Sequence, residues 1–183
     1  MTVQTKDHKS VSISLLAIDK LPALVNYLDK LSQATRRRFE PHSFDSQSVT
    51  NFYQDANHRA YIAESVDEPE IVAYFIIKRG FLPKEAERLE SYGLQLSAET
   101  DCTFAPSVAD AWQSSGVGNL LFRMVLNELQ TEPFERMILW GGVQSSNERA
   151  IRFYEKYGFR ELGYFEHNGI GNYDMIKELK AFA

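Results

Sequence analysis

The sequence is poor in the residues that build disulfide frameworks and metal sites. Its 183 residues include one cysteine, Cys102, which excludes an intramolecular disulfide and a zinc site built from cysteines. Its four histidines stand at positions 8, 42, 58 and 167, without the spacing of metal ligands. We therefore expect a protein that works without a bound metal.

Long apolar runs and an excess of positive charge are also missing. No apolar run approaches the ~20 residues that cross a bilayer, and the N-terminal MTVQTKDHKS lacks the apolar segment of a signal peptide. The formal net charge is -5, and the short Arg36-Arg37-Arg38 cluster is too small for a nucleic-acid footprint. We expect a soluble, cytoplasmic protein that binds neither nucleic acid nor membranes. The oligomeric state stays open, a homodimer included.

What is present fits one globular domain over residues 1–183. The hydrophobic fraction of 44% and the charged fraction of 25% are ordinary for a chain with a packed core. Asp19, Asp45 and Asn147 are expected to cap helices, and Gly158 to end one. Hydrophobic periodicity predicts helices that start after these caps and over 116–130, and strands over 11–18, 60–66, 71–78, 100–108, 137–143, 159–165 and 173–179. Pro83 and the charged KEAERLES run predict a helical turn in an exposed insertion.

This order predicts an α/β fold of the α+β kind. We expect three layers, with a mostly antiparallel mixed sheet of about seven strands and helices on both faces.

The most informative segment lies between the predicted strand 100–108 and the helix 116–130, and reads Gln113-Ser114-Ser115-Gly116-Val117-Gly118. The first N–H groups of a helix have no partner inside it, and its dipole favours negative charge there. Glycines let the backbone approach an anion closely. A diphosphate fits these features, and a tight strand-to-helix turn is the alternative. Neither a lysine of the Walker A type nor a GxGxxG pattern is present.

Two spaced blocks resemble the GNAT superfamily of N-acetyltransferases. Val108 followed by Gln113, Gly116 and Gly118 resembles its motif A, and the run from Asn147 to Phe159 resembles its motif B. The order of elements is also similar to the GNAT fold over nearly the whole chain. The resemblance implies acetyl-CoA as co-substrate and an amine, on a small molecule or a peptide, as acceptor.

The resemblance also implies where coenzyme A is held. The pantetheine arm is expected along Pro106–Val108, with Met137–Val143 as the splayed neighbour. The diphosphate is expected on the backbone of Ser114, Ser115, Gly116, Val117, Gly118 and Asn119, beside Gln113. Asn147 is either a helix cap alone or also a contact to the pantetheine.

Motif B carries the catalytic candidate. Tyr154 matches the GNAT tyrosine whose hydroxyl approaches the thioester sulfur, so it is expected to be the general acid. The alternative is an ordinary half-buried aromatic residue. Several GNAT enzymes use a glutamate on the fifth strand as base, and the corresponding Leu139–Val143 lacks one. Glu99 or Asp101 is the substitute, or else both belong to a solvated strand end.

The resemblance further implies an acceptor site built from two polar loops, 36–45 and 167–172, with Arg37, His42 and His167 as candidate binding residues. The expected reaction is direct attack by a primary amine on the acyl thioester of acetyl-CoA. Because the strand glutamate is missing, a catalytically silent acyl-CoA-binding sensor or interaction module remains the competing hypothesis.

Overall fold

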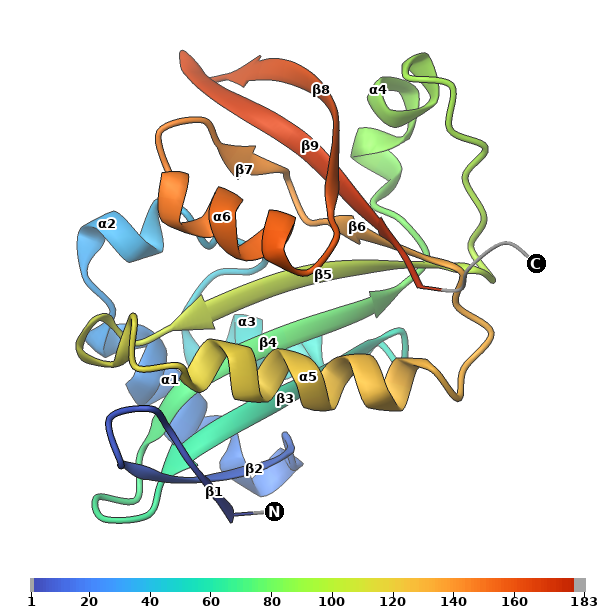
Figure 1. Cartoon of the computed structure of the whole chain (residues 1–183). Helices are drawn as coiled ribbons and strands as arrows, with labels where there is room; N and C mark the ends of the chain where they lie inside the picture. The colour runs from blue at the N-terminus through green and yellow to red at the C-terminus, as the bar shows by residue number, and fades with distance from the viewer. Residues whose placement is uncertain (1, 180–183) are drawn as a thin grey trace. The chain divides into compact units, whose positions relative to one another are not determined.

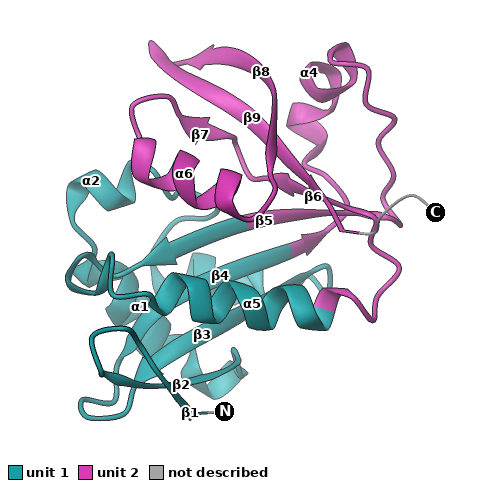
Figure 2. Ribbon diagram, in the orientation of Figure 1, with its two compact units in different colours: residues 1–77, 105–128 teal, residues 78–104, 129–183 magenta. Residues whose placement is uncertain are grey.

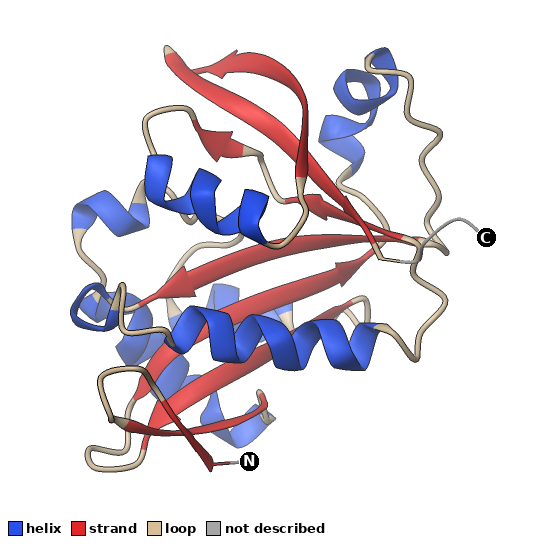
Figure 3. Ribbon diagram, viewed as in Figure 1, coloured by secondary structure: helices blue, strands red, loops and turns tan. Residues whose placement is uncertain are grey.

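The computed structural model describes residues 2–179 and has a mixed α/β architecture (Figures 1 and 3). Within this range nine strands form a mostly antiparallel sheet, in which β5 and β6 are a parallel pair. The strands are β1 (Thr2–Gln4), β2 (Ser10–Leu15), β3 (His58–Ser65), β4 (Ile71–Arg79), β5 (Asp101–Val108), β6 (Arg136–Leu139), β7 (Val143–Gln144), β8 (Arg160–His167) and β9 (Ile170–Glu178).

The helices fall between these strands in the expected order, with one additional short helix over residues 33–36. They are α1 (Leu21–Lys30), α2 (Gln33–Arg36), α3 (Ser46–Phe52), α4 (Ala86–Ser91), α5 (Val117–Leu129) and α6 (Glu148–Lys156), with short 3-10 turns η1 (Ile18–Lys20), η2 (Pro83–Glu85) and η3 (Asp110–Trp112). No helix among the described residues has the length and apolar character to span a bilayer.

The predicted fold class is confirmed, with two more strands than the expected seven or so. One is β1, a three-residue strand paired with β2. The other arises because the predicted strand 137–143 is interrupted. Gly141 and Gly142 have φ values of 66° and 68°, a left-handed conformation that a continuous strand does not contain, so the run divides into β6 and β7.

Contacts between Cα atoms divide the chain into two compact units (Figure 2). Unit 1 contains residues 1–77 and 105–128, and unit 2 contains residues 78–104 and 129–183. A single domain over 1–183 stays a prediction.

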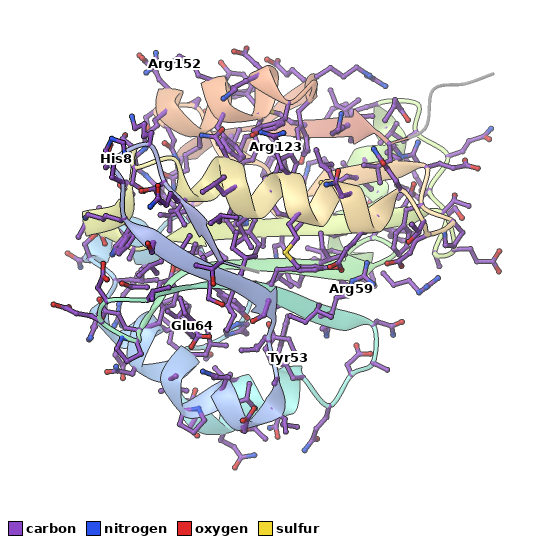
Figure 4. The ribbon with its side chains drawn as sticks, turned by 60° about the horizontal axis from the view of Figure 1, so that its bottom comes forward. His8, Tyr53, Arg59, Glu64, Arg123 and Arg152 are labelled. Carbon is purple, nitrogen blue, oxygen red and sulfur yellow. The ribbon has the colours of Figure 1, made fainter. Side chains whose placement is uncertain are left out.

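In unit 1, helices cover both faces of the strands. α5 lies on one face of β3 and β4, and α1 and α3 lie on the other (Figures 1 and 4). The side of α5 that faces the strands is apolar, whereas Arg123 points outward (Figure 4). The buried core includes Val11, Ile13, Leu24, Leu28, Val49, Ile62, Val72, Leu121, Phe122 and Val125.

In unit 2, α4 and α6 supply separate apolar contacts. Leu89 of α4 packs with Ile138 of β6 and Ile176 of β9 in one buried cluster. Tyr154 of α6 contacts Phe159, whose ring stacks on Phe104 at 6.5 Å between centroids. The insertion at 80–97 does contain the expected helix, but Leu82, Glu85 and Leu89 are buried, so its predicted exposure is wrong.

The cap predictions have different outcomes. Asp45 Oδ1 accepts a hydrogen bond from the Ser48 N–H at 2.9 Å, as expected at the start of α3. Gly158, with φ of 79°, follows the end of α6 as expected. Asp19 does not cap a helix, because it lies inside η1 and α1 begins after Lys20.

Candidate functional site

The glycine loop belongs to unit 1 and joins η3 to α5. Ser114 and Gly116 both have positive φ, 64° and 96°, in the turn just before the helix begins. Backbone with left-handed residues between right-handed ones can direct N–H groups into a concavity that suits an anion. The N–H groups of Ser114, Gly116 and Gly118 have no hydrogen-bond acceptor within residues 2–179. These three donors are what the loop offers to a ligand.

Two side chains of the loop serve its internal structure. The buried Ser115 hydroxyl donates to the Trp112 carbonyl at 2.6 Å and accepts from the Val117 N–H at 3.3 Å. The Gln113 amide nitrogen donates to the Val108 carbonyl at 3.2 Å and to Thr35 Oγ1 at 3.3 Å. The structure therefore brings Gln113 and Val108 together, and it uses the Ser115 hydroxyl to hold the turn.

A polar network fastens the segment before the loop to the start of α2. Asp110 accepts hydrogen bonds from the Ser32 N–H at 3.0 Å and from the hydroxyls of Ser32 and Thr35, each at 2.8 Å. Partial burial acts to raise the pKa of Asp110, but these hydrogen bonds outweigh it and the pKa is lowered. Asp110 is thus a loop-fixing carboxylate, and the network orients Thr35 toward Gln113.

The N-terminal hairpin supports the same loop. The Lys6 N–H donates to the Ser115 carbonyl at 3.2 Å. A Cβ at position 116 would lie 3.5 Å from Lys6 Cγ, and the positive φ of Gly116 would strain any other residue. Lys9 Nζ lies 4.6 Å from the centroid of the Trp112 ring. Residues 5–9 therefore form part of the loop's scaffold.

The β5 residues expected along the pantetheine differ in exposure. Pro106 and Val108 are partly exposed, whereas Ser107 between them is buried and hydrogen-bonds the Tyr27 hydroxyl at 2.8 Å. This alternation is the two-residue period of a strand. Pro106 and Val108 thus share the face of β5 that is not tied to Tyr27.

In unit 2, motif B forms α6. Asn147 is the N-cap, with its side-chain oxygen accepting from the Ala150 N–H at 3.4 Å. Tyr154 is the one buried residue of α6 and packs edge-on to Phe153 at 5.6 Å between ring centroids. Burial raises the pKa of the Tyr154 phenol above its usual value, and the hydroxyl is protonated at neutral pH, as it would be without the shift. A protonated hydroxyl is what a proton donor needs.

The two base candidates lie at the start of β5. Asp101 is buried and accepts from Arg136 Nη2 at 2.8 Å and from the Ser97 N–H at 2.9 Å. Glu99 is exposed in the turn that precedes Asp101. Asp101 is thus engaged in an ion pair that joins β5 to β6, and the base assignment remains a prediction.

The acceptor candidates occupy different surroundings. His42 is half-buried against the Phe52 ring and shares hydrogen bonds with the Tyr74 hydroxyl at 2.9 Å and the Ser43 carbonyl at 2.8 Å. Burial lowers the pKa of His42, although the Ser43 carbonyl opposes it. Arg37 is exposed after α2, and His167 is exposed at the end of β8. The expected loop 167–172 is short, because β9 begins at Ile170.

Sequence reasoning missed one group of charged residues in unit 2. Glu85 of η2 and Asp174 of β9 are both buried, and Arg88 of α4 contacts both carboxylates. In the sequence, Glu85 and Arg88 are three residues apart, a spacing that brings side chains together on a helix. No local signal linked either residue to Asp174, which lies 86 positions after Arg88. Among the described residues no cluster of three or more metal-ligating side chains has the arrangement of a metal site.

Comparisons with known proteins agree with this architecture. No curated protein matches the chain. Among solved structures, the chain is similar to the GNAT domain of PAT from S. lividans, with a TM-score of 0.75, 17% identity, and 97% and 96% of the two chains covered. It is also similar to the ribosomal-protein-S18-alanine N-acetyltransferase from Escherichia coli (TM-score 0.63, 17% identity, 94% and 96% covered).

A chimeric spermidine N-acetyltransferase from Vibrio cholerae is similar as well, with a TM-score of 0.64, 18% identity, and 92% and 95% of the two chains covered. At these identities the similarity shows the fold. The sequence itself matches the model of the acetyltransferase (GNAT) family over residues 28–159. This match covers most of the chain, both motif blocks included, and the chain therefore belongs to the GNAT acetyltransferase family.

Proposed function

We propose that this chain is an N-acyltransferase that moves an acetyl group from acetyl-CoA to a primary amine. The observation that carries the proposal is the glycine loop, where the N–H groups of Ser114, Gly116 and Gly118 are available at the start of α5. Gly116 and Gly118 leave room for an anion close to the backbone. The 3'-phospho-ADP part of coenzyme A supplies a diphosphate of the right charge.

The reaction needs two proton transfers. The amine attacks the thioester carbonyl, the nitrogen loses a proton, and the carbon–sulfur bond breaks with its electron pair on sulfur. The Tyr154 hydroxyl is the donor that we assign to the departing thiolate. Its phenol is protonated at neutral pH, as that of an ordinary tyrosine is, and its hydrogen bond to sulfur strengthens as charge develops there.

Cofactor residues and acceptor residues have separate tasks in this proposal. Pro106 and Val108 accompany the pantetheine, and Asn147 caps α6 and can also meet the pantetheine. Arg37, His42 and His167 contact the acceptor. The similar structures include enzymes whose names specify an alanine of ribosomal protein S18 and spermidine as acceptors. Both are primary amines, so the proposal covers small-molecule and peptide acceptors.

A broad amine screen tests the proposal. Thiol release from acetyl-CoA is followed with polyamines, amino acids, aminoglycosides and peptides with free N-termini. Transfer to at least one amine, with a product of the mass expected for acetylation, supports the enzyme. Coenzyme A binding without thiol release for any amine would favour the competing function, a silent acyl-CoA sensor.

A further inference from the structure

Glu85 carries a buried carboxylate in unit 2. The residue is 4% exposed, and its Oε2 has no hydrogen-bond donor among the described residues. Arg88 Nη2 lies 3.6 Å from Oε1, beyond hydrogen-bonding distance. Buried polar atoms are nearly always hydrogen-bonded, so a buried carboxylate with an unpartnered oxygen has unused capacity to accept a proton or a further hydrogen bond.

The nearest cation to Glu85, Arg88, forms its hydrogen bonds with another carboxylate, that of Asp174. Arg88 donates to Asp174 from Nε at 2.7 Å and from Nη2 at 3.1 Å, and its guanidinium stacks on the Phe165 ring at 3.8 Å. We call Glu85, Arg88 and Asp174 the Glu85 cluster. Two carboxylates share one guanidinium, which leaves the cluster one negative charge in excess. Lys84, the other cation that acts on Glu85, is exposed on η2. A buried negative excess attracts a proton or a cation.

The Glu85 carboxylate faces the interruption between β6 and β7. A Cβ built at Gly141 would lie 3.8 Å from Glu85 Oε1, and within 4 Å it would meet no other heavy atom of the described residues apart from Trp140 and Gly142 on either side in the chain. At Gly142 the situation is opposite, because a Cβ there would lie 2.6 Å from the Tyr173 carbonyl oxygen. The space beside Gly141 is therefore open, and Glu85 Oε1 borders it.

The strand that ends at this space has no carboxylate of its own. Residues 136–144 read RMILWGGVQ. Glu85 reaches the same place from the insertion between β4 and β5. We propose that Glu85 is the general base of the acyl transfer, accepting the acceptor's N–H proton on Oε1, directly or through one bound water, from the space beside Gly141. This proposal rests on the proposed function.

The proton balance is complete without another reagent. The nitrogen lone pair forms the new bond to the carbonyl carbon, and the nitrogen's proton moves to the Glu85 carboxylate. The carbon–sulfur electron pair leaves with sulfur, which takes the Tyr154 proton. Exchange with solvent then restores both side chains. Burial, with a further contribution from Asp174, raises the pKa of Glu85 despite the opposing charges of Arg88 and Lys84. A carboxylate with a raised pKa is a stronger base at neutral pH.

Glu85→Gln tests the role, because it keeps the shape and removes the basic oxygen. With an amine identified by the screen, single-turnover transfer is expected to fall by about 10²–10⁴-fold, the range for a positioned base. Acetyl-CoA affinity, measured by calorimetry, should be unchanged. The wild-type rate should decrease as the pH falls through the Glu85 pKa, and this acidic limb should be absent in Glu85→Gln. Glu85→Asp should recover part of the rate. Glu87→Gln, an exposed neighbour on α4, should match the wild type.

A second measurement needs no acceptor. Infrared difference titration of the wild type against Glu85→Gln should show one carboxyl group that protonates at higher pH than the exposed carboxylates do. Titration in the ordinary range, or a Glu85→Gln enzyme with wild-type rates and an intact acidic limb, would overturn the proposal. If no amine releases thiol from acetyl-CoA even with the wild type, the proposed function itself fails and the role of Glu85 falls with it.

Discussion

Arg88 and Asp174, 86 residues apart, form a two-point ion pair in which Nε and Nη2 of one guanidinium contact both oxygens of one carboxylate. Asp174 is 1% exposed, so this contact is made away from water. It connects the helix that follows Glu85 to β9. The orientation of the Glu85 cluster therefore depends on a tertiary contact.

Removing that contact should be costly. Arg88→Ala leaves the buried carboxylates of Glu85 and Asp174 without their cation, and we expect the free energy of unfolding to fall by about 3–5 kcal/mol. Urea unfolding measures this change. Arg152→Ala is the control, because Arg152 pairs with Glu148 on the surface of α6, 69% exposed (Figure 4), and its loss should cost less than ~0.5 kcal/mol. Similar losses for both variants would contradict the structural role of Arg88.

Gly118→Asp separates helix stability from anion binding. Gly118 is the second residue of α5, where an acidic side chain stabilises the helix dipole. The same charge repels a diphosphate, so we expect the fold to persist while coenzyme A affinity falls at least ~10-fold. Calorimetry measures the affinity. Asn127→Asp introduces the same charge at an exposed position near the other end of α5 and should leave binding unchanged. Unaltered affinity in folded Gly118→Asp would reject the glycine loop as the diphosphate site.

Tyr154→Phe removes one hydroxyl and retains the ring that packs on Phe159 at 5.3 Å between centroids. The fold and the affinity for acetyl-CoA should survive, since the ring supplies most of the buried area. Single-turnover transfer should fall by about 10²–10⁴-fold, the usual contribution of a positioned acid. Single turnovers are preferable to kcat because product release can mask the chemical step. A wild-type rate in this variant would make Tyr154 a structural residue.

His42 should make stability depend on pH. Burial lowers its pKa in the folded state, with His58 adding to the effect and the Ser43 carbonyl and Asp45 opposing it. Below the unfolded-state pKa of about 6.5, the unfolded chain binds more protons at this position than the folded one. The stabilisation is therefore complete above that pH and is lost as the pH falls through the folded-state pKa.

Unfolding experiments between about pH 5 and 7 measure this dependence. His42→Gln should be less stable than the wild type at neutral pH by ~1 kcal/mol, because the contact with Tyr74 is altered, but its stability should change less with pH. His167→Gln is the control, since that imidazole is exposed at the end of β8. Equal pH slopes for the wild type and His42→Gln would argue against a pKa lowered by burial.

Local signals in the sequence predicted the motif-bearing elements well. The helix caps depend only on nearby residues. Asp45 and Asn147 each accept a hydrogen bond from an N–H group three residues later, and Gly158 adopts a positive φ after the helix ends. Neighbouring residues were therefore enough to identify all three. The helix after the glycine loop was predictable for the same reason, because its apolar positions recur with the period of one helix.

The charged interior of unit 2 could not be predicted in this way. Glu85 belongs to a run of charged residues typical of an exposed turn, yet it is buried, and Leu89 of the same segment packs with Ile138 of β6 and Ile176 of β9, far away in the sequence. Asp101 likewise appeared to be a free strand end, although its partner is Arg136, 35 positions later. Tertiary packing decides whether a carboxylate is paired, unpaired or exposed. The residues next to that carboxylate in the sequence do not reveal this packing.

The Lys6 N–H donates a hydrogen bond to the Ser115 carbonyl, more than one hundred positions further along the chain. The exchange rate of the Lys6 amide hydrogen therefore depends on the conformation of the glycine loop. If ligand binding stiffens that loop, deuterium uptake at the Lys6 amide should slow in step with occupancy. A fusion or tag attached ahead of β1 could displace residues 5–9. Such a displacement would alter the hydrogen bond from Lys6 to Ser115 and, with it, the conformation at Gly116. Exchange at the Lys6 amide would thus report on the state of the glycine loop without any added probe.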